Sequence, residues 1–365
     1  MSKIHQIALT KIKGMGPKTA RVLLDHYGSV ENIFQAPEHE LRSLQIGKRR
    51  IENLFSKDHL QEAEQETTFM EKHGIRPLWF TDPDYPQRLL TCEDAPLLLY
   101  YKGAANLNPL RCVSIVGSRN ATAYGKRICE ELIAGLQEYE VQIVSGLAYG
   151  IDVQAHRLAL KQHIPTIGVL GHGLDRIYPA VHREVASAML QQGGLLTEYP
   201  SETDTHPGNF PARNRIIAGL ADVTIVVEAA QKGGALITAE IANSYNRDVC
   251  AFPGGIDQGY SAGCNYLIKT HRAHLIRHAE DLIYLMGWEK PKVQRQSKQL
   301  SLLAEGLSKD EQRVYSFLQD REQASMDEIA RHLDWPTSKL AMILLEMELN
   351  NQLLSLPGKA YRIIQ

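Results

Sequence analysis

Short β-branched runs alternating with helical stretches dominate the middle of this chain and constrain its fold most. Six such runs lie between residues 112 and 252, and nearly every one is continuously apolar. They are Cys112–Val116, Val141–Val144, Thr166–Leu170, Gly194–Thr197, Val223–Val227 and Val249–Phe252. Strands that are apolar without alternation are typical of a parallel sheet buried on both faces. The stretches Gly125–Tyr139 and Ile151–Gln162 have the length of crossover helices. We therefore predict an α/β domain with a doubly wound parallel sheet, whose ligands bind beyond the carboxyl ends of the strands.

Glycines follow five of these six runs. The segments are Gly117-Ser118-Arg119, Ser145-Gly146 through Asp152, Gly171 through Pro179, Lys232-Gly233-Gly234 through Thr238 and Glu240, and Pro253-Gly254-Gly255. A glycine lets the backbone approach a phosphate, and a serine hydroxyl and an arginine fork can then hold it. These segments share one edge of the predicted sheet, which indicates a wide groove lined by backbone. The alternative is that short strand-to-helix loops need glycine for their own turns.

The segment Phe210–Leu220 combines an aromatic ring, two guanidinium groups and an amide, and then becomes apolar and helical. Arginine offers a forked donor for phosphate, and phenylalanine offers a flat face for a base. This combination indicates an anionic ligand with stackable rings. The alternative is a charged helix start whose arginines pair with carboxylates. For Asn214 and Arg215 we favour the second role, in which they brace the helix.

Other classes of site lack their usual signals. No Gly-x-Gly-x-x-Gly opens the first helix of the sheet, which argues against NAD binding. The histidines lack metal-binding spacing, and the five cysteines include no Cys-x-x-Cys pair. We expect no cofactor, no metal and no catalytic residues. The net charge is −2, so any site for a polyanion must concentrate its arginines and lysines locally. No apolar run reaches membrane-spanning length, and the first residues lack a signal-peptide core, which predicts a cytoplasmic protein with no membrane partner.

The segments that flank the central region are helical. Ile12–Arg21 resembles a helix-hairpin-helix motif, in which Gly14, Gly16 and Lys18 are candidates for an auxiliary DNA phosphate contact. Leu44–Ile51 is a weaker echo of it, with Gln45 in place of the first glycine. At the other end, three predicted helices are followed by a hairpin, which is the pattern of a winged helix. Its third helix, Thr337–Asn350, is mostly apolar and acidic. We therefore favour a protein contact or accessory role over reading of duplex DNA.

The predicted organisation has four parts: a helical domain at 1–72, the α/β domain at 75–287, a linker at 288–307 and the winged-helix-like domain at 308–365. Residues 58–73 are rich in Glu and Gln and predict an exposed helix. Residues 78–103 predict one added strand and a lead-in to the sheet.

Several motifs stand in fixed order along residues 80–280. They are Gly117-Ser118-Arg119, Ser145 through His156, Gly171 through Pro179, Phe210 through Leu220, Glu228-Ala229, Thr238-Ala239, Pro253-Gly254 and Asn265. Together they resemble the bacterial DprA (Smf) family. The resemblance implies an extended Rossmann-like domain that forms a homodimer, between a small helical domain and a winged-helix-like one. It implies a single-stranded DNA-binding recombination mediator, not an enzyme. Such a protein protects DNA that enters during natural transformation and loads the RecA recombinase for homologous recombination.

The groove and the resemblance together define the candidate DNA site. Its residues are Gly117, Ser118, Arg119, Gly146, Phe210, Arg213, Asn214, Arg215, Lys232, Gly233, Gly234 and Thr238. Arg119, with Ser118 and the Gly117 backbone, is expected to hold one phosphate and Arg213 a neighbouring one. Phe210 is expected to stack on bases, while amides near Gly146 and Gly233 add uncharged donors. Lys232 stands where the family often has Ser, which either adds a phosphate contact or shifts the loop.

The main alternative is a nucleotide-processing enzyme. The loop from Lys232 to Glu240 is similar to the Pro-Gly-Gly-x-Gly-Thr-x-x-Glu loop of cytokinin-activating phosphoribohydrolases. Glu240 would then be the catalytic acid/base for a nucleoside monophosphate. Gln231-Lys232 at the proline position and Ile237 at the second glycine depart from that pattern, and the flanking domains have no place in a small hydrolase. An NAD-dependent oxidoreductase and a scaffold without a ligand are further alternatives that fit less well.

Overall fold

The protein is described by a computed structural model, which covers residues 3–44, 46–56, 58–290, 307–319, 321, 323–350, 352–356 and 360–363. The chain forms two compact units, Met1–Pro291 and Lys292–Gln365. Most of the predicted linker at 288–307 lies outside the described residues, as do Gln45 and the Pro357-Gly358 turn of the C-terminal hairpin. The finer boundary between residues 72 and 75, inside the first unit, stays a prediction.

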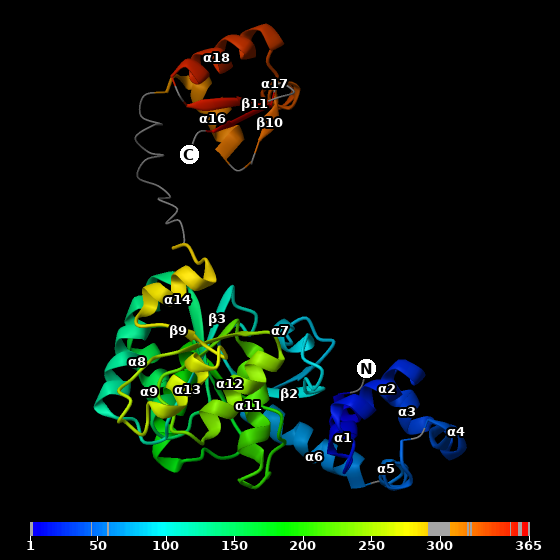
Figure 1. Cartoon of the computed structure of the whole chain (residues 1–365). Coiled ribbons are helices and arrows are strands. Elements are labelled where there is room, and N and C mark those ends of the chain that lie inside the picture. Colours follow the sequence, from blue (N-terminus) through cyan, green and yellow to red (C-terminus); the bar gives the residue numbers. More distant parts are fainter. Residues whose placement is uncertain are drawn as a thin grey trace. The chain divides into compact units, whose positions relative to one another are not determined.

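A nine-stranded sheet forms the centre of the first unit, in the order β1-β2-β6-β5-β4-β3-β7-β8-β9 among the described residues (Figure 1). The strands are β1 (Arg76–Trp79), β2 (Leu98–Gly103), β3 (Arg111–Val116), β4 (Val141–Ser145), β5 (Thr166–Val169), β6 (Gly194–Thr197), β7 (Val223–Val226), β8 (Asp248–Ala251) and β9 (His274–Leu275). From β6 to β9 in this spatial order, all neighbouring strands pair in parallel. The six predicted strands and the doubly wound sheet are confirmed, with bounds that differ by one residue at most.

Helices cover both faces of this sheet. They are α7 (Gln87–Leu90), α8 (Ala123–Leu136), η1 (Gln137–Tyr139), α9 (Ile151–Lys161), η2 (Ala180–His182), α10 (Arg183–Gln192), α11 (Asn209–Leu220), α12 (Gly234–Ser244), α13 (Ala262–Lys269) and α14 (Ala279–Met286). Side chains of α8, α9 and α14 bury one face, and those of α11, α12 and α13 bury the other. The helix α11 therefore begins at the carboxyl edge of the sheet and runs back along it, which places Phe210 at that edge.

The added segment contributes two strands where one is predicted. β1 pairs with β2, and β2 pairs with β6, both antiparallel. Alternate residues of β2 face two different cores: Leu99 and Tyr101 join the core of the sheet, whereas Leu98 and Tyr100 pack against the N-terminal helices. A strand that is buried on both faces shows no alternation in sequence, so its partner strand is hard to recognise.

The N-terminal residues form a bundle of short helices. They are α1 (Lys3–Lys11), α2 (Pro17–Tyr27), α3 (Val30–Gln35), α4 (Glu38–Ser43), α5 (Lys48–Leu54) and α6 (Asp58–His73). The predicted turn is present, because Gly14 has φ +85° and α2 begins with Pro17. The helix α6 is less exposed than expected. Its Glu66 is buried and accepts hydrogen bonds from the backbone N–H and hydroxyl of Ser201, at 2.9 and 2.6 Å.

Among its described residues, the second unit has three helices and a small antiparallel sheet in the order β10-β12-β11. Its elements are α16 (Lys309–Gln319), β10 (Ala324–Ser325), α17 (Met326–Leu333), α18 (Thr337–Leu349), β11 (Leu353–Leu356) and β12 (Ala360–Ile363). A capping box of Ser325 and Glu328 opens α17. Its own apolar core is centred on Val314, Ile329 and Leu344. This arrangement confirms the predicted winged helix.

Candidate functional site

A cavity of about 750 Å³ lies beyond the carboxyl ends of β3 and β7, at the edge that the strand order predicts. Five chain segments surround it: the loop after β3, the start of α9, the start of α11, the loop between β7 and α12 and the loop between β8 and α13. The predicted site residues that line it are Gly117, Ser118, Arg119, Phe210, Arg213, Asn214, Lys232, Gly233, Gly234 and Thr238. The structure thus brings ten of the twelve predicted DNA-site residues to one cavity and leaves Gly146 and Arg215 outside its lining.

Two cations at the cavity are exposed and free. Arg119 follows β3, and Lys232 precedes α12. Neither side chain has a hydrogen-bond or ion-pair partner within the part of the chain that the structure describes. Both therefore keep their hydrogen-bonding capacity for a ligand, and an anion near them would replace water instead of a carboxylate.

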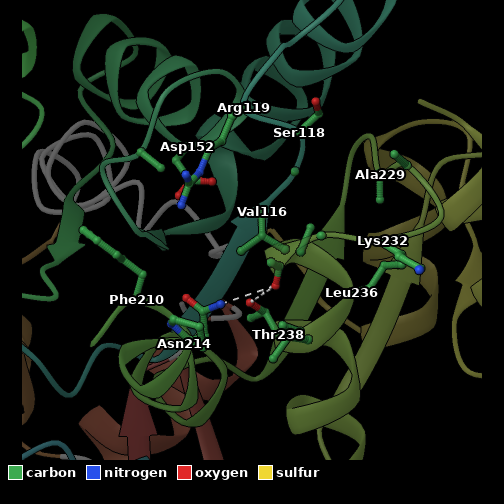
Figure 2. Close-up of a pocket in the computed structure, with 18 of the residues that line it drawn as sticks. Val116, Ser118, Arg119, Asp152, Phe210, Asn214, Ala229, Lys232, Leu236 and Thr238 are labelled. Carbon is green, nitrogen blue, oxygen red and sulfur yellow. Dashed lines mark hydrogen bonds between the residues drawn. The ribbon is translucent and has the colours of Figure 1, made fainter. Parts of the chain in front are cut away.

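The wall between these cations is apolar and partly aromatic. Val116, Ala229 and Leu236 line the cavity, and Figure 2 shows Phe210 on the side opposite Lys232. Beside Phe210 stands Tyr178, whose ring centroid is 5.8 Å away at an interplanar angle of 38°. The side chain of Tyr178 is half exposed. A partly exposed aromatic pair next to free cations provides faces for bases and charges for phosphates.

Gly117 is required by close packing. A Cβ at this position would lie 2.6 Å from Cγ1 of Ile151, at the start of α9. The backbone of Ser118 bridges the two neighbouring loops: its N–H donates to the carbonyl of Glu228 at 2.8 Å, and its carbonyl accepts from Ile151 at 3.1 Å. The hydroxyl oxygen of Ser118 accepts from the N–H of Asn120 at 3.0 Å. These contacts fix the loop that carries Arg119.

The side chains of Asn214 and Thr238 hold the start of α12 in place. Both donate to the carbonyl of Gly234, at 3.3 and 3.0 Å, and both are almost fully buried (Figure 2). The space next to Gly233 is open, since a Cβ there would meet nothing within 4 Å. The start of α12 thus lines the cavity with two residues, Gly233 and Gly234, that carry no side chain. Asn214 acts on the loop in this conformation, while a direct DNA contact by it stays a prediction.

Arg213 differs from the expected free arginine. Its side chain is 4% exposed, and its Nη1 donates to the carbonyl of Gly146 at 2.6 Å and to that of Val169. Burial lowers the pKa of Arg213 to about 10, although the nearby carboxylate of Asp152 opposes this change. Burial likewise raises the pKa of Asp152, against the effects of Arg213 and several hydrogen bonds. Arg213 thus ties the ends of β4 and β5 together, and a phosphate contact would require it to give up these carbonyls.

Gly146 makes room for this buried pair. A Cβ at Gly146 would lie 2.6 Å from a carboxylate oxygen of Asp152 and 2.8 Å from the Arg213 guanidinium. The carbonyl of Gly146 is taken by Arg213, and its amide helps to hold Asp152. The predicted amide donor at Gly146 is thus directed to Asp152 instead of the cavity, which corrects that expectation.

Arg215 lies outside the cavity. Its guanidinium pairs with Glu198, donates to the carbonyl of Asp94 at 2.7 Å, and has Nε at 3.9 Å from the Asp94 carboxylate. These contacts are compatible with the bracing role that the sequence favours for Arg215, and a DNA contact by Arg215 stays a prediction.

The auxiliary residues form a separate surface on the helical bundle. Gly16 precedes Pro17 at the start of α2, and a Cβ at Gly14 would lie 3.6 Å from Cγ of Arg50. Lys18 makes an exposed ion pair with Glu93 at 2.8 Å, and this hydrogen bond raises the pKa of Lys18. An exposed pair of this kind exchanges readily with solvent ions. A phosphate contact by Lys18 stays a prediction.

The enzyme alternative loses its key residue. Glu240 lies on α12 but does not line the cavity, and it pairs with Arg272 at 2.6 Å.

Within the described residues, no three His, Cys, Asp or Glu side chains gather as they do in a metal site. None of the described helices is both long and apolar enough to span a bilayer.

Several residues at or beside the cavity were not predicted to bind DNA, among them Tyr178, Tyr260 and Gln231. Tyr260 and Gln231 line the cavity, and the Tyr260 hydroxyl accepts from Asn120 at 3.2 Å. Tyr178 belongs to a motif that the sequence does identify, but its contact with Phe210, at the start of α11, joins positions 32 residues apart. An aromatic residue within a glycine-rich loop at the sheet edge is the signal that points to Tyr178.

The histidines behind the cavity make stability depend on pH. Burial lowers the pKa of His156 to about 3, because its imidazole is enclosed beside Thr166 and near Arg213. The unfolded chain binds this proton near pH 6.5, whereas the native protein does not. Stability from this group is therefore complete above pH 6.5 and is lost as the pH falls towards 3. We expect His156→Gln to reduce the acid slope of the unfolding free energy by about 1.4 kcal/mol per pH unit.

Urea unfolding between pH 7 and 4.5 measures this difference. The matched control is His39→Gln, because His39 is exposed on α4 and its replacement should leave the slope unchanged. Equal slopes for wild type and His156→Gln would show that His156 is charged in the native protein.

With this geometry established, comparison with known proteins identifies the family. The model of the family "DNA recombination-mediator protein A" matches residues 76–287. The chain belongs to the DprA (Smf) family. The DprA winged helix domain matches residues 299–359, and a SAM-like helix-hairpin-helix tandem matches residues 7–57.

Individual relatives agree with this assignment. Protein Smf of Synechocystis sp. is 37% identical over 291 residues, which cover 78% of this chain and 72% of the relative. DNA processing protein DprA of Streptococcus pneumoniae is 43% identical over 202 residues, covering 55% of this chain and 71% of the relative. The X-ray structure of the pneumococcal DprA matches with a TM-score of 0.67 and 33% identity, over 79% of this chain and 99% of that one.

A second solved structure comes from a DprA of another bacterium. DNA processing protein A of Helicobacter pylori was studied for its single-stranded DNA binding mode. It matches with a TM-score of 0.54 and 30% identity, over 59% of this chain and 97% of that one.

Proposed function

We propose that this DprA family member binds single-stranded DNA in the cavity at the carboxyl edge of its sheet and acts as a recombination mediator. One observation carries the proposal: Arg119 and Lys232 are exposed and lack partners among the described residues, and they line one cavity with an apolar wall and the ring of Phe210. The description of the Helicobacter pylori relative supports the same ligand.

The chemistry of the strand matches the layout of the site. Arg119 holds one phosphate with its guanidinium fork, and Lys232 with the first amides of α12 holds another. Bases between these phosphates rest on Val116 and Leu236 or stack on Phe210. A duplex keeps its bases stacked inside and cannot use these faces. Because the contacts read phosphates and ring faces instead of base edges, we expect little preference for sequence.

The buried residues around the cavity hold the binding groups in place. Arg213 ties the ends of β4 and β5, and Asn214 and Thr238 hold the first turn of α12. The cavity is therefore preorganised, and little ordering entropy is lost when the strand binds. A direct contact by Thr238 or Asn214 would need the carbonyl of Gly234 to be released.

The biological role rests on the family. We infer that the protein forms a homodimer, protects incoming single strands during natural transformation and loads RecA onto them, and that it does so in the cytoplasm. Membership in a family of recombination mediators supports this role. A protein that holds the strand by phosphates and one base face leaves other bases free for pairing, which suits delivery to a recombinase.

Titration of a labelled dT oligonucleotide and a length-matched duplex tests the binding, with the mass of each complex measured. We expect the single strand to bind at least about tenfold more tightly, and equal affinity would contradict the proposal. RecA ATPase on single strands covered by single-strand-binding protein tests the loading. The protein should stimulate it, and Arg119→Ala should not.

Stacking gives a separate prediction. Phe210→Ala should weaken dT binding by about 1–3 kcal/mol, and Tyr178→Ala by a similar or smaller amount, because each removes a ring on which a base can lie. Neither change removes a positive charge, so the salt dependence of binding should stay that of the wild type. Anisotropy titrations at four salt concentrations measure both quantities. Tyr284→Ala is the control, since Tyr284 is an exposed ring on α14 away from the cavity. A change in salt slope for Phe210→Ala would contradict a stacking role.

A further inference from the structure

The outer face of α18 is apolar and is not covered by the described residues of the winged-helix unit. Met342, Leu345 and Leu349 expose 73%, 57% and 75% of their surfaces. Their spacing of three and four residues aligns them in one stripe along the helix. The opposite face is buried in the core of the unit through Leu340, Leu344 and Met347. Packing within the unit thus explains one face of α18 and leaves the other without a function.

This stripe is unsuited to nucleic acid. The third helix of a winged helix reads the major groove through Arg, Lys, Asn or Gln. The exposed face of α18 instead carries methionine and leucine, and Glu346 beside them is exposed and acidic. Phosphates would meet a negative charge here, and base edges would meet side chains without donors. A protein surface is the occupant that this chemistry fits.

The charged residues beside the stripe indicate which protein surface binds to it. Lys339 and Glu346 lie seven residues apart, which is close to two turns, so they flank the same side of the stripe. A two-fold axis that lies in the interface, perpendicular to the helix, makes the second copy of α18 run in the opposite direction. It leaves the charged residues of both copies on the same side of the stripe. Two antiparallel copies of α18 therefore place each Lys339 next to Glu346 of the other copy, and the two Met342 side chains next to each other at the axis. We propose that the stripe is a docking surface for a second copy of this chain, paired through α18.

The present contacts of Lys339 are compatible with this pairing. Its ammonium group is 2.7 Å from the carboxylate of Asp310 and 4.3 Å from the ring centroid of Trp335, and the side chain remains 44% exposed. An ammonium group has three donors, so it can keep Asp310 and also meet Glu346 of the other copy.

The size of the stripe sets the strength of the contact. A stable interface buries about 1,200–2,000 Å² in total, and three side chains per copy provide much less. The pairing should be weak in dilute solution and should form where two chains are already held close together. It does not depend on DNA binding, so either proposal can fail while the other stands.

Disulfide trapping in the full-length protein tests the pairing. The five native cysteines are all buried, so an introduced cysteine is the reactive one. Met342→Cys lies next to the proposed axis and should form a disulfide between chains at least about tenfold faster than Arg331→Cys. Arg331 is exposed on the neighbouring helix α17 and serves as the matched control. A rate equal to that of the control would overturn the proposal.

Charge reversal tests the antiparallel geometry. In the Met342→Cys protein, Glu346→Lys should slow the disulfide to the control rate, because it opposes two lysines. Adding Lys339→Glu should restore it. This change also removes the exposed ion pair with Asp310 and the contact of the ammonium group with the Trp335 ring. Thermal unfolding of each variant verifies that the unit remains folded. Fast trapping that ignores both reversals would overturn the antiparallel pairing.

Discussion

Replacing Arg119 and Lys232 together with alanine should lower the affinity for single-stranded DNA by at least about 100-fold. A hydrogen bond to a charged group contributes about 1.5–3 kcal/mol to binding, and each of the two substitutions removes one free cation from the cavity. The double variant should also reduce the slope of log affinity against log salt by about 1.4, because each phosphate contact on a single strand contributes about 0.7. Folding should be unaffected, since neither side chain contacts another described residue through a hydrogen bond or ion pair.

Anisotropy titrations with dT oligonucleotides from 50 to 300 mM salt measure both effects. The matched control is Arg127→Ala combined with Lys161→Ala, which removes the same two charges from outside the cavity. Arg127 pairs with Glu131 at 3.3 Å, and Lys161 pairs with Glu130 at 3.6 Å. Losing these pairs should change affinity less than about threefold, through the general field of the protein alone.

The single variants separate the two loops. Arg119→Ala should account for the larger share of the loss, because a guanidinium fork binds phosphate in two-point geometry and an ammonium group acts as a point charge. If Lys232→Ala keeps both wild-type affinity and wild-type slope, then Lys232 only shifts its loop. Wild-type behaviour of the double variant would remove the cavity as the DNA site.

Much of the fold could be predicted because it follows from local patterns. Continuous apolar runs give the parallel strands, and the order of runs and helices gives a doubly wound sheet. The second added strand was missed because β1 is short and its partner β2 is buried on both faces by two different cores. Burial on both faces depends on the N-terminal helices, and no pattern within residues 76–103 reveals them.

The candidate site could be predicted in position but not in the state of each side chain. Glycines at the strand ends place the loops together, because the carboxyl ends of parallel strands share one edge. Arg119, Arg213 and Arg215 look alike in sequence. In the structure one is exposed, one is buried on carbonyls, and one is held by carboxylates. The hydrogen-bond partners of Arg213 lie 44 or more positions away in the chain. Only the tertiary structure therefore distinguishes the roles of the three arginines.

Arg213 itself gives the largest expected effect on stability. Arg213→Ala should destabilise the first unit by roughly 3–5 kcal/mol, because it leaves Asp152 buried without its compensating charge. It also removes the donor from the carbonyls of Gly146 and Val169, which are buried at the ends of β4 and β5. Arg213→Lys should lose nearly as much, since one ammonium group cannot reproduce the planar fork. Thermal and urea unfolding measure these losses.

The same variants decide whether Arg213 contacts DNA. If it braces the rim, Arg213→Lys and Arg213→Ala should lower affinity only as far as the cavity loosens, and the salt slope of the folded fraction should stay that of the wild type. If it contacts a phosphate, Arg213→Ala should reduce the slope by about 0.7 while Arg213→Lys keeps it. Asp152→Asn is the matched control, because it removes the buried charge without touching the guanidinium donors. The guanidinium of Arg213 would have to release the carbonyls of Gly146 and Val169 before it could contact a phosphate. We therefore expect the bracing outcome, with a loss of stability that exceeds the loss of affinity.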